Sequence, residues 1–463
     1  MVRSSRSAVA ARVAAVLAVL GAGFAAFSAP PRYRLVTLPE APTLPGATHQ
    51  YANPDGVITD HGDVYGSVQF FFPDASFDHL VRYERQDAGY VVHDRGRPDP
   101  DVVLMRVASA NTSGDVVLSR ALEGFGPIRY YLYRDGQWLL DWLAVHPDAV
   151  PLNPPQPKAV NNARQIGAEI LMINPPELRP PFSARQFALY ADPLADVELL
   201  GNFGNHVTLR SMNSAADLSG SVTFPGSSAA YPAVVRGGAL TLLTIAGVNI
   251  ERGTATFISD SGLVAGTMRT GTSGGLQRPV RWNADNQGVV LPLLPDAPEG
   301  QCDGIHDSGI AIGACFGSGF SIQAVLWTPD GSVHRLADLA ENFEGSGWSA
   351  FHFALSINRH GWILVSGGVG PTQQPRYGVL VPLCRADLTG SADPDDPRYG
   401  IADGLTDAGD FFFFLDHFAA GDLAVADLTG SAAPDHPAYG VPDGVIDAQD
   451  FFYYLDLFTG PCS

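Results

Sequence analysis

The feature that most constrains the fold is a short pattern that recurs along residues 33–382. Each copy has an apolar residue, a polar pair, usually a glycine, and then an alternating apolar run that ends in small residues. The clearest copies are "ISDSGLVAGT" from Ile258 and "IHDSGIAIGA" from Ile305. If the glycine, or the residue in its place, is the marker, the copies lie at positions 62, 114, 164, 216, 262, 309 and 361. Seven units therefore follow one another at intervals of 46 to 52 residues.

Each unit predicts several short antiparallel strands. A second apolar run with a tight-turn signal follows the first in several copies, as in "AVLWTPDG" at 324–331 and "AVVRGG" at 233–238. The chain has 50 Gly and 36 Pro but only 16% charged residues, a balance that suits strands joined by turns. About seven repeats of three or four strands are typical of a β-propeller, in which each blade buries its faces against its neighbours.

We therefore predict a mainly β protein with a β-propeller of about seven blades over 33–382. The strand "YRLVTL" at 33–38 precedes the first full repeat and is expected to complete the last blade. A repeat solenoid is the alternative architecture.

The first 29 residues are typical of a secretory signal peptide. Three arginines precede an apolar run from Val13 to Leu20, and small residues follow it, which places cleavage near Ser28 or Ala29. The run is shorter than the ~20 apolar residues that a membrane span needs. We expect a secreted bacterial protein, extracellular or on the cell surface, with no transmembrane segment.

Four cysteines in an exported chain suggest disulfides. Cys302 and Cys315 flank a glycine-containing turn, and Cys384 and Cys462 bracket the C-terminal segment. Of the three possible connectivities, we favour Cys302 with Cys315 and Cys384 with Cys462.

The C-terminal segment, residues 384–463, is strongly acidic and internally duplicated. It holds fifteen Asp against two Arg, in a chain whose net charge is −20. This charge argues against nucleic acid as a partner and favours bound cations. The stretch "ADLTGSADPDDPRYGIADGLTDAGDFFFFLDHF" from Ala386 matches "ADLTGSAAPDHPAYGVPDGVIDAQDFFYYLDLF" from Ala426 at an offset of forty residues.

Both copies fit the second part of an EF-hand loop, in which oxygens at positions 1, 3, 5, 7, 9 and 12 hold Ca²⁺ around a glycine at position 6. Position 6 is Gly404 or Gly444. Positions 5, 7 (through its carbonyl), 9 and 12 are Asp403, Leu405, Asp407 and Asp410 in the first copy, and Asp443, Val445, Asp447 and Asp450 in the second. Hard oxygen donors at this spacing favour two Ca²⁺ ions, and acidic turns without metal are the alternative.

An apolar helix is expected after each loop. Phe411, Phe414, Leu415 and Phe418 fall on one helical face, and the second copy repeats the pattern with Phe451, Tyr454, Leu455 and Phe458. Phe413 and Tyr453 point the other way, so they form either a docking surface for a partner or a face that the chain itself covers.

The segment 384–463 resembles a dockerin module, specifically the type that ends in Gly and Cys, here "GPC" at 460–462. The resemblance implies a small α-helical EF-hand-like calcium module and a cohesin-like protein partner. In ordinary dockerins positions 1 and 5 lie four residues apart, whereas Asp387 and Asp403 lie sixteen apart. If Asp387 and Asp427 are position 1, with Thr389 and Thr429 at position 3, an insertion loops out within each copy.

The central repeats resemble the HAF-type repeats of secreted bacterial proteins.

Catalytic signals are weak. "GTSGG" at 271–275 matches G-x-S-x-G, but Ser273 lies between two strands of a repeat and not on the strand-to-helix turn that a nucleophile elbow needs. The residues Asp60, Asp260 and Asp307 are interpreted as turn residues that bond to nearby amides, and Glu84, Glu123 and Glu169 are available without a motif.

The expected function is calcium-dependent binding and attachment, with the propeller as the surface for a partner or a glycan. A carbohydrate-active enzyme tethered by the same module is the alternative.

Overall fold

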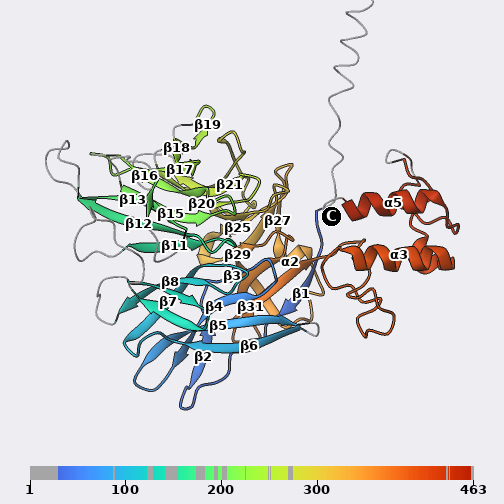
Figure 1. Ribbon diagram of the computed structural model, residues 1–463, viewed down its shortest axis with the longest axis horizontal. Coiled ribbons are helices and arrows are strands. Elements are labelled where there is room, and N and C mark those ends of the chain that lie inside the picture. Colours follow the sequence, from blue (N-terminus) through green and yellow to red (C-terminus); the bar gives the residue numbers. More distant parts are fainter. Residues whose placement is uncertain are drawn as a thin grey trace, which may run out of the picture.

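The computed structural model describes residues 30–86, 89–122, 129–140, 155–173, 183–191, 197–200, 206–224, 226–248, 250, 252–269, 275–433, 436 and 438–459. Within these residues the strands form seven mainly antiparallel sheets that follow one another along the chain around a common centre, which is a seven-bladed β-propeller (Figure 1). The predicted signal peptide, Ser273, Glu123 and Cys462 lie outside the described residues.

In blades 1 to 4 and 6 the strands follow one another in chain order from the centre outwards. Blade 1 has β2 (His49–Ala52), β3 (Val57–Ile58), β4 (Val64–Phe71), β5 (Ser76–Gln86) and β6 (Gly89–Gly96). Blade 2 has β7 (Val102–Ala110), β8 (Val116–Leu122), β9 (Arg129–Arg134) and β10 (Gln137–Leu140). Blade 3 has β11 (Gln156–Val160), β12 (Ile166–Ile173), β13 (Ser183–Tyr190) and β14 (Glu198–Leu199). Blade 4 has β15 (His206–Met212), β16 (Leu218–Thr223), β17 (Ala230–Arg236) and β18 (Ala239–Leu242).

The remaining blades are similar, but in blades 5 and 7 the first short strand lies at the outer edge of the sheet and the second strand is innermost. Blade 5 has β19 (Thr244–Ile245), β20 (Arg252–Ile258), β21 (Val264–Arg269), β22 (Gln277–Trp282) and β23 (Gln287–Val290). Blade 6 has β24 (Glu299–Ile305), β25 (Ala311–Phe316), the 3₁₀ turn η1 (Ser318–Phe320), β26 (Ile322–Trp327) and β27 (Val333–Arg335). A helical turn, α2 (Leu336–Leu339), leads to blade 7, which has β28 (Ala340–Glu341), β29 (Trp348–Ile357), β30 (Ile363–Val369) and β31 (Gln374–Pro382).

The N-terminal strand closes the ring. Strand β1 (Tyr33–Thr37) lies in the sheet of blade 7, antiparallel to β31 and parallel to β28. The prediction that residues 33–38 complete the last blade is therefore confirmed, and the alternative of an open solenoid is excluded.

The seven marker positions share one backbone conformation. Glycines occupy five of them, at 62, 114, 262, 309 and 361, and all five have positive φ. Arg164 and Ala216 stand in the other two, and each also has φ of 63°. The sequence repeat thus records a left-handed turn between the first two strands of each blade, which glycine adopts without steric cost.

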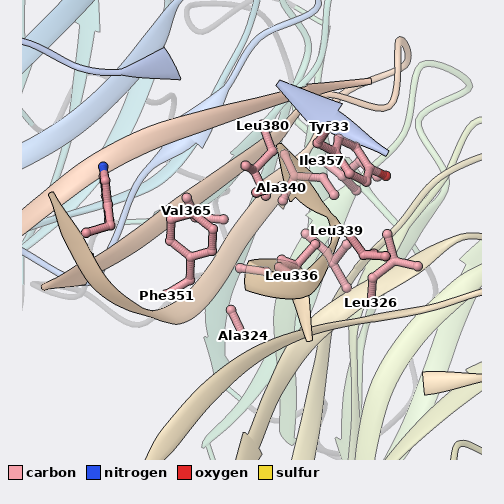
Figure 2. Packing of buried hydrophobic residues seen from close by; sticks show 14 residues of the cluster. Tyr33, Ala324, Leu326, Leu336, Leu339, Ala340, Phe351, Ile357, Val365 and Leu380 are labelled. Carbon is pink, nitrogen blue, oxygen red and sulfur yellow. The ribbon is translucent and has the colours of Figure 1, made fainter. Parts of the chain in front are cut away.

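The core consists of apolar layers between adjacent blades and not of one central cluster. Figure 2 shows the layer between blades 6 and 7, where Leu326, Phe351 and Leu380 come from three strands. Tyr33 of β1 and Leu336 of α2 complete this layer. The ring therefore depends on packing between residues at opposite ends of the propeller sequence.

Two helices follow the propeller, α3 (Ala408–Ala420) and α5 (Ala448–Thr459), with a short turn, α4 (Leu423–Ala426), between them. In Figure 1 they lie outside the ring of sheets. Phe414 and Tyr454 stack with ring centroids 3.9 Å apart, and Phe411, Phe418, Phe451 and Phe458 pack around them. The predicted helix faces are confirmed for these six aromatic residues, whereas Leu415 and Leu455 lie outside this cluster. No helix in the described part of the chain is long and apolar enough to cross a membrane.

The predicted disulfide between Cys302 and Cys315 is wrong. Both thiols are free and buried, Cys302 on β24 and Cys315 on the adjacent β25. In this ladder Cys302 lies opposite Gly313, and Cys315 lies opposite Gly300. The two cysteines are therefore diagonal neighbours, whose Cα separation of roughly 7–8 Å is too long for a disulfide. They act as small apolar residues in the layer between blades 5 and 6. The pairing of Cys384 with Cys462 remains a prediction.

Candidate functional site

A cavity of about 1520 Å³ lies at the centre of the propeller. Residues from the innermost strand of every blade, or from the turn that follows it, line this cavity: Val57, Val107, Val160, Ser211, Thr256, Ile305 and Ser356 are examples, one from each blade. Because all seven blades contribute, the cavity is a property of the closed ring.

A repeated irregularity directs side chains into the cavity. Six of the seven innermost strands have a β-bulge at equivalent positions, and the bulged residues are Ala108, Lys158, Arg210, Thr256, Asp303 and Leu355. All of them except Lys158 line the cavity. A bulge re-aims a side chain, so the chemistry of the cavity is set largely by this one position of the repeat.

The glycines in "LSGS", "VAGT" and "AIGA" lie opposite these bulges. A Cβ added at Gly220, Gly266 or Gly313 would approach a backbone carbonyl oxygen of the innermost strand to 1.9, 2.2 or 2.1 Å. The small residues that end each apolar run in the sequence therefore accommodate the bulge.

A ring of polar turns surrounds one end of the cavity. Asp260 accepts a hydrogen bond from the amide of Ser214 at 2.8 Å, and Asp307 accepts one from the amide of Ser261 at 2.7 Å. Each of these amides belongs to the preceding blade. Asp60 closes the ring by accepting from the amide of Arg359 in blade 7 at 3.1 Å. The interpretation that Asp60, Asp260 and Asp307 bond to amides is confirmed, but the bonds link neighbouring blades.

The cavity wall also contains Asp55 and Asp303, and the pKa of each of these two carboxyl groups is raised. Burial raises the pKa of Asp55 to about 6, against hydrogen bonds from the Ser67 hydroxyl and the Val107 amide. Burial likewise raises the pKa of Asp303 to about 6, against a hydrogen bond that the Gln301 amide donates at 2.8 Å. Neither residue carried a motif in the sequence. Asp55 lies in the link between β2 and β3, and Asp303 is the bulged residue of β24.

The other acidic candidates have structural partners. The Glu84 carboxylate lies 2.9 Å from His93 Nε2 and 3.1 Å from Arg82. Glu169 is buried, accepts from Arg185 at 2.8 Å, and accepts from the Leu209 amide of the next blade. Neither residue lines the cavity.

The C-terminal loops are held by their carboxylates. The Asp410 side chain is fully buried, and its two oxygens accept from the amides of Leu388, Thr389 and Asp407. Asp387 accepts from the amides of Asp403 and Gly404 at 2.9 and 2.7 Å. The second copy repeats these contacts through Asp450 and Asp427. The inserted residues thus leave positions 1, 5 and 12 within one loop.

The other predicted ligands lie in the same loops. Asp403 Oδ1 accepts from the Leu405 amide, and Asp407 caps α3 by accepting from Gly409, as Asp443 and Asp447 do in the second copy for Val445 and Gln449. The Thr389 hydroxyl donates to the Ser391 carbonyl and accepts from the Gly400 amide, which anchors the insertion. Thr429 makes the same pair of contacts with Ser431 and Gly440.

The donor types in these loops fit a hard cation. Burial, and then the nearby charges of Asp410 and Asp403, raise the pKa of Asp387 to about 7, against the hydrogen bonds from two amides. A divalent cation would neutralise this excess of negative charge. In the described loops, however, the carboxylate oxygens accept hydrogen bonds from backbone amides, and no three carboxylates lie close enough together to form a metal site. Carboxylate oxygens keep a second lone pair when they accept an amide, so this arrangement is compatible with ligation. Calcium binding remains a prediction.

Phe413 and Tyr453 do not form an open docking surface. Both are buried, because the inserted segments fold back over them. Tyr399 of the first insertion packs on Phe413 at 4.7 Å between ring centroids, and Tyr439 of the second packs on Tyr453 at the same distance. The hydroxyl of Tyr453 also accepts from Arg385 at 2.9 Å. The chain itself therefore covers this face of each helix.

The first loop, but not the second, is docked on the propeller. The Gly404 carbonyl accepts from the indole of Trp362 in blade 7 at 3.1 Å. The Asp403 carbonyl accepts from Arg85 of blade 1 at 2.9 Å, and the Arg85 guanidinium lies 4.4 Å from the Trp362 ring centroid. Leu405 packs into the apolar layer beside Trp362, whereas its counterpart Val445 is 56% exposed. The two copies thus have different surroundings despite their similar sequences.

This asymmetry gives a matched pair of substitutions. Gly404 and Gly444 both have positive φ, at 92° and 86°, so alanine costs roughly 1–2 kcal/mol of backbone strain at either site. A Cβ on Gly404 would also lie 2.4 Å from Val381, whereas one on Gly444 meets nothing within 4 Å. We expect Gly404→Ala to release the module from the propeller, measured as faster proteolysis after Pro382, and Gly444→Ala to leave the docking unchanged. Equal cleavage rates in the two variants would contradict this docking.

Comparison with known proteins identifies no family. No family model matches the chain, and no curated protein matches it. Among solved structures, the β-propeller domain of the Trilobed protease from Pyrococcus furiosus aligns with 72% of this chain and 94% of its own, at 9% identity and a TM-score of 0.43. An oligogalacturonate lyase in complex with manganese aligns over 75% and 96%, at 11% identity and a TM-score of 0.42. A six-bladed fucose-binding lectin from Aleuria aurantia aligns over 66% and 96%, at 10% identity and a TM-score of 0.33. These likenesses say nothing of function, and the fold assignment rests on the seven sheets of this chain.

Proposed function

We propose that this chain is an extracellular binding protein. Its propeller cavity binds a glycan, and its C-terminal module attaches it to a protein partner. The observation that carries the proposal is the central cavity, lined by all seven blades and shaped by a bulge repeated in six of them. A large concave site with a few convergent polar groups is the usual form of a ligand site.

The C-terminal module supplies the attachment. Its first loop is fixed to the propeller through Asp403 and Gly404, so the second loop and its helix are left for a partner. Val441, Val445 and Phe452 of the second copy are each more than half exposed. Together with the dockerin-like sequence, this supports a protein partner of the cohesin type.

Binding by the propeller is tested with the full chain against a panel of neutral and acidic glycans. We expect a subset of glycans to bind without being changed, as followed by calorimetry and by chromatography of the glycan afterwards. Turnover of a glycan would instead establish the carbohydrate-active alternative. If no glycan on the panel binds, the proposal that the cavity is a glycan site fails.

Calcium binding is tested by calorimetric titration of the EGTA-treated chain. We expect two ions per chain, and stabilisation of the module of about 2.7 kcal/mol when free Ca²⁺ is a hundred times its dissociation constant. In the second loop, Asp427, Asp443, Asp447 and Asp450 with the Val445 carbonyl would hold the ion, and Thr429 is the predicted sixth donor.

The variant Asp443→Asn tests one loop without removing its turn. The side-chain oxygen that accepts from the Val445 amide is retained, but the charge is lost. We expect the titration to show one ion fewer or a much weaker second ion, with unchanged helix content. The exposed Asp416→Ala is the control. Identical titrations of Asp443→Asn and the parent chain would argue for acidic turns without metal.

A further inference from the structure

Five arginines line the central cavity: Arg106 on β7, Arg210 on β15, Arg252 on β20, Arg269 on β21, and Arg359 in the turn after β29. The carboxylates of the same wall already have partners. Asp55 accepts from Ser67 and Val107, Asp303 accepts from Gln301, and the carboxylates at the polar end of the cavity accept from amides of neighbouring blades. Within the described residues, Arg359 lies 4.0 Å from Asp60, whereas the other four guanidinium groups have no carboxylate partner.

Two of the arginines lie on adjacent strands and face each other across the sheet. Arg252 and Arg269 are directly opposite in the antiparallel ladder between β20 and β21. Like charges in this position destabilise a sheet, since the Cβ atoms lie only about 4.5–5.5 Å apart. Within the described part of the chain no carboxylate pairs with either guanidinium, and Arg269 donates only to the neutral amide of Gln277.

A third arginine lies on the neighbouring blade. Arg210 is the bulged residue of β15, and β15 is in contact with β20. Burial lowers the pKa of Lys158 to about 8, and the positive charges of Arg185 and Arg210 lower it further, against the charge of Glu169. Arg210 thus adds a third arginine on the blade next to Arg252 and Arg269.

We propose that Arg210, Arg252 and Arg269, the arginine cluster, bind a carboxylate of an acidic oligosaccharide in the central cavity. The planar guanidinium fork matches a carboxylate in a bidentate fashion, and an anion between Arg252 and Arg269 would remove their repulsion. The neighbouring side chains Thr254, Gln277 and Gln301 offer neutral hydrogen-bonding groups for sugar hydroxyls. This inference rests on the proposed function, because it specifies the ligand class for the same cavity.

The test compares one sugar backbone with and without its charge. The full chain is titrated with hexagalacturonate and with its methyl ester, at low and at high salt. We expect hexagalacturonate to bind more tightly than the ester, and the difference to shrink as salt screens the charges. The double variant R252Q/R269Q should lose about tenfold or more in affinity for the acid and little for the ester. The control R278Q changes a partly buried arginine of β22 that lies outside the cavity wall and donates to the Pro298 carbonyl.

Stability separates a binding role from a structural one. Without ligand, R252Q/R269Q should unfold at the same temperature as the parent chain or at a higher one, because a like-charged pair is removed. A clear fall in stability would overturn the proposal. Equal binding of the acid and the ester would overturn it and leave the glycan-binding function intact, as would tight binding of other glycans with no binding of hexagalacturonate. Equal or tighter binding of poly-glutamate would also overturn it, because the ligand would then be an acidic peptide.

Discussion

Replacing Tyr33 by alanine is expected to lower the free energy of unfolding of the propeller by about 3–5 kcal/mol. Tyr33 belongs to β1, the strand that closes the ring, and only 1% of its surface is exposed. It lies in the layer that Figure 2 shows, together with Leu336, Leu339 and Leu380. The substitution leaves a cavity between blades 6 and 7, and it also weakens the hold of β1 on β31. Since single domains are stable by only about 5–15 kcal/mol, this loss is large.

Arg32→Ala is the matched control for Tyr33→Ala. Arg32 is the preceding residue and its side chain is exposed, while its backbone carbonyl accepts from the Leu383 amide in either variant. We expect this change to alter stability by less than about 0.5 kcal/mol. Urea unfolding followed by tryptophan fluorescence measures both variants. If the two unfold at the same urea concentration, closure by β1 contributes little to the stability of the ring.

Phe414→Ala is expected to unfold the C-terminal helices while the propeller stays folded. Phe414 is fully buried and stacks on Tyr454 with an angle of 6° between the ring planes. Truncation of such a residue costs about 3–5 kcal/mol, and a small apolar core rarely supplies more than that in total. The expected result is a loss of helical circular dichroism and rapid proteolysis beyond residue 383, with the strand signal retained.

The neighbouring phenylalanine provides the control for Phe414→Ala. Phe412 lies on the same helix and is 55% exposed, so Phe412→Ala removes as many atoms from a site that water already reaches. We expect its helix content and proteolysis to match the parent chain. Loss of helix in both variants would mean that helix propensity, and not the aromatic stack, holds the module together.

The repeat allowed the propeller to be predicted because its marker is a backbone requirement. A left-handed turn favours glycine wherever it occurs, so the turn appeared in the sequence at regular intervals. The closing strand could also be predicted, since residues 33–38 read as a strand without a repeat of its own. Arg164 and Ala216 show the limit of this signal, because a non-glycine residue takes the same conformation when the surrounding blade imposes it.

The cavity could not be predicted from the sequence. Asp55, Asp303 and Arg252 face the same space from different blades, and no spacing in the chain reports which side of a strand faces the centre once a bulge shifts the register. The cysteine prediction failed for a related reason, because a diagonal pair and an opposite pair look alike in sequence.

The C-terminal loops were predictable in outline. Asp387 and Asp403 are sixteen residues apart, yet the side chain of the first accepts from the amide of the second, as positions 1 and 5 of one loop would. The sequence left open whether the chain covers Phe413 and Tyr453, because the answer depends on the direction of two tyrosines in the inserted segments, which the sequence does not give.

The docked first loop has a mechanical consequence. Its contacts reach Trp362 in blade 7 and Arg85 in blade 1, and Arg34 of β1 donates to the Ala402 carbonyl, so the module bridges the two blades where the ring was closed. If a partner holds the second copy, tension on the chain would enter the propeller at this seam. The two ends of the ring would then share this tension, and one outer strand would not bear it alone. The join between the first and last blade is thus also the place where the propeller holds the C-terminal module.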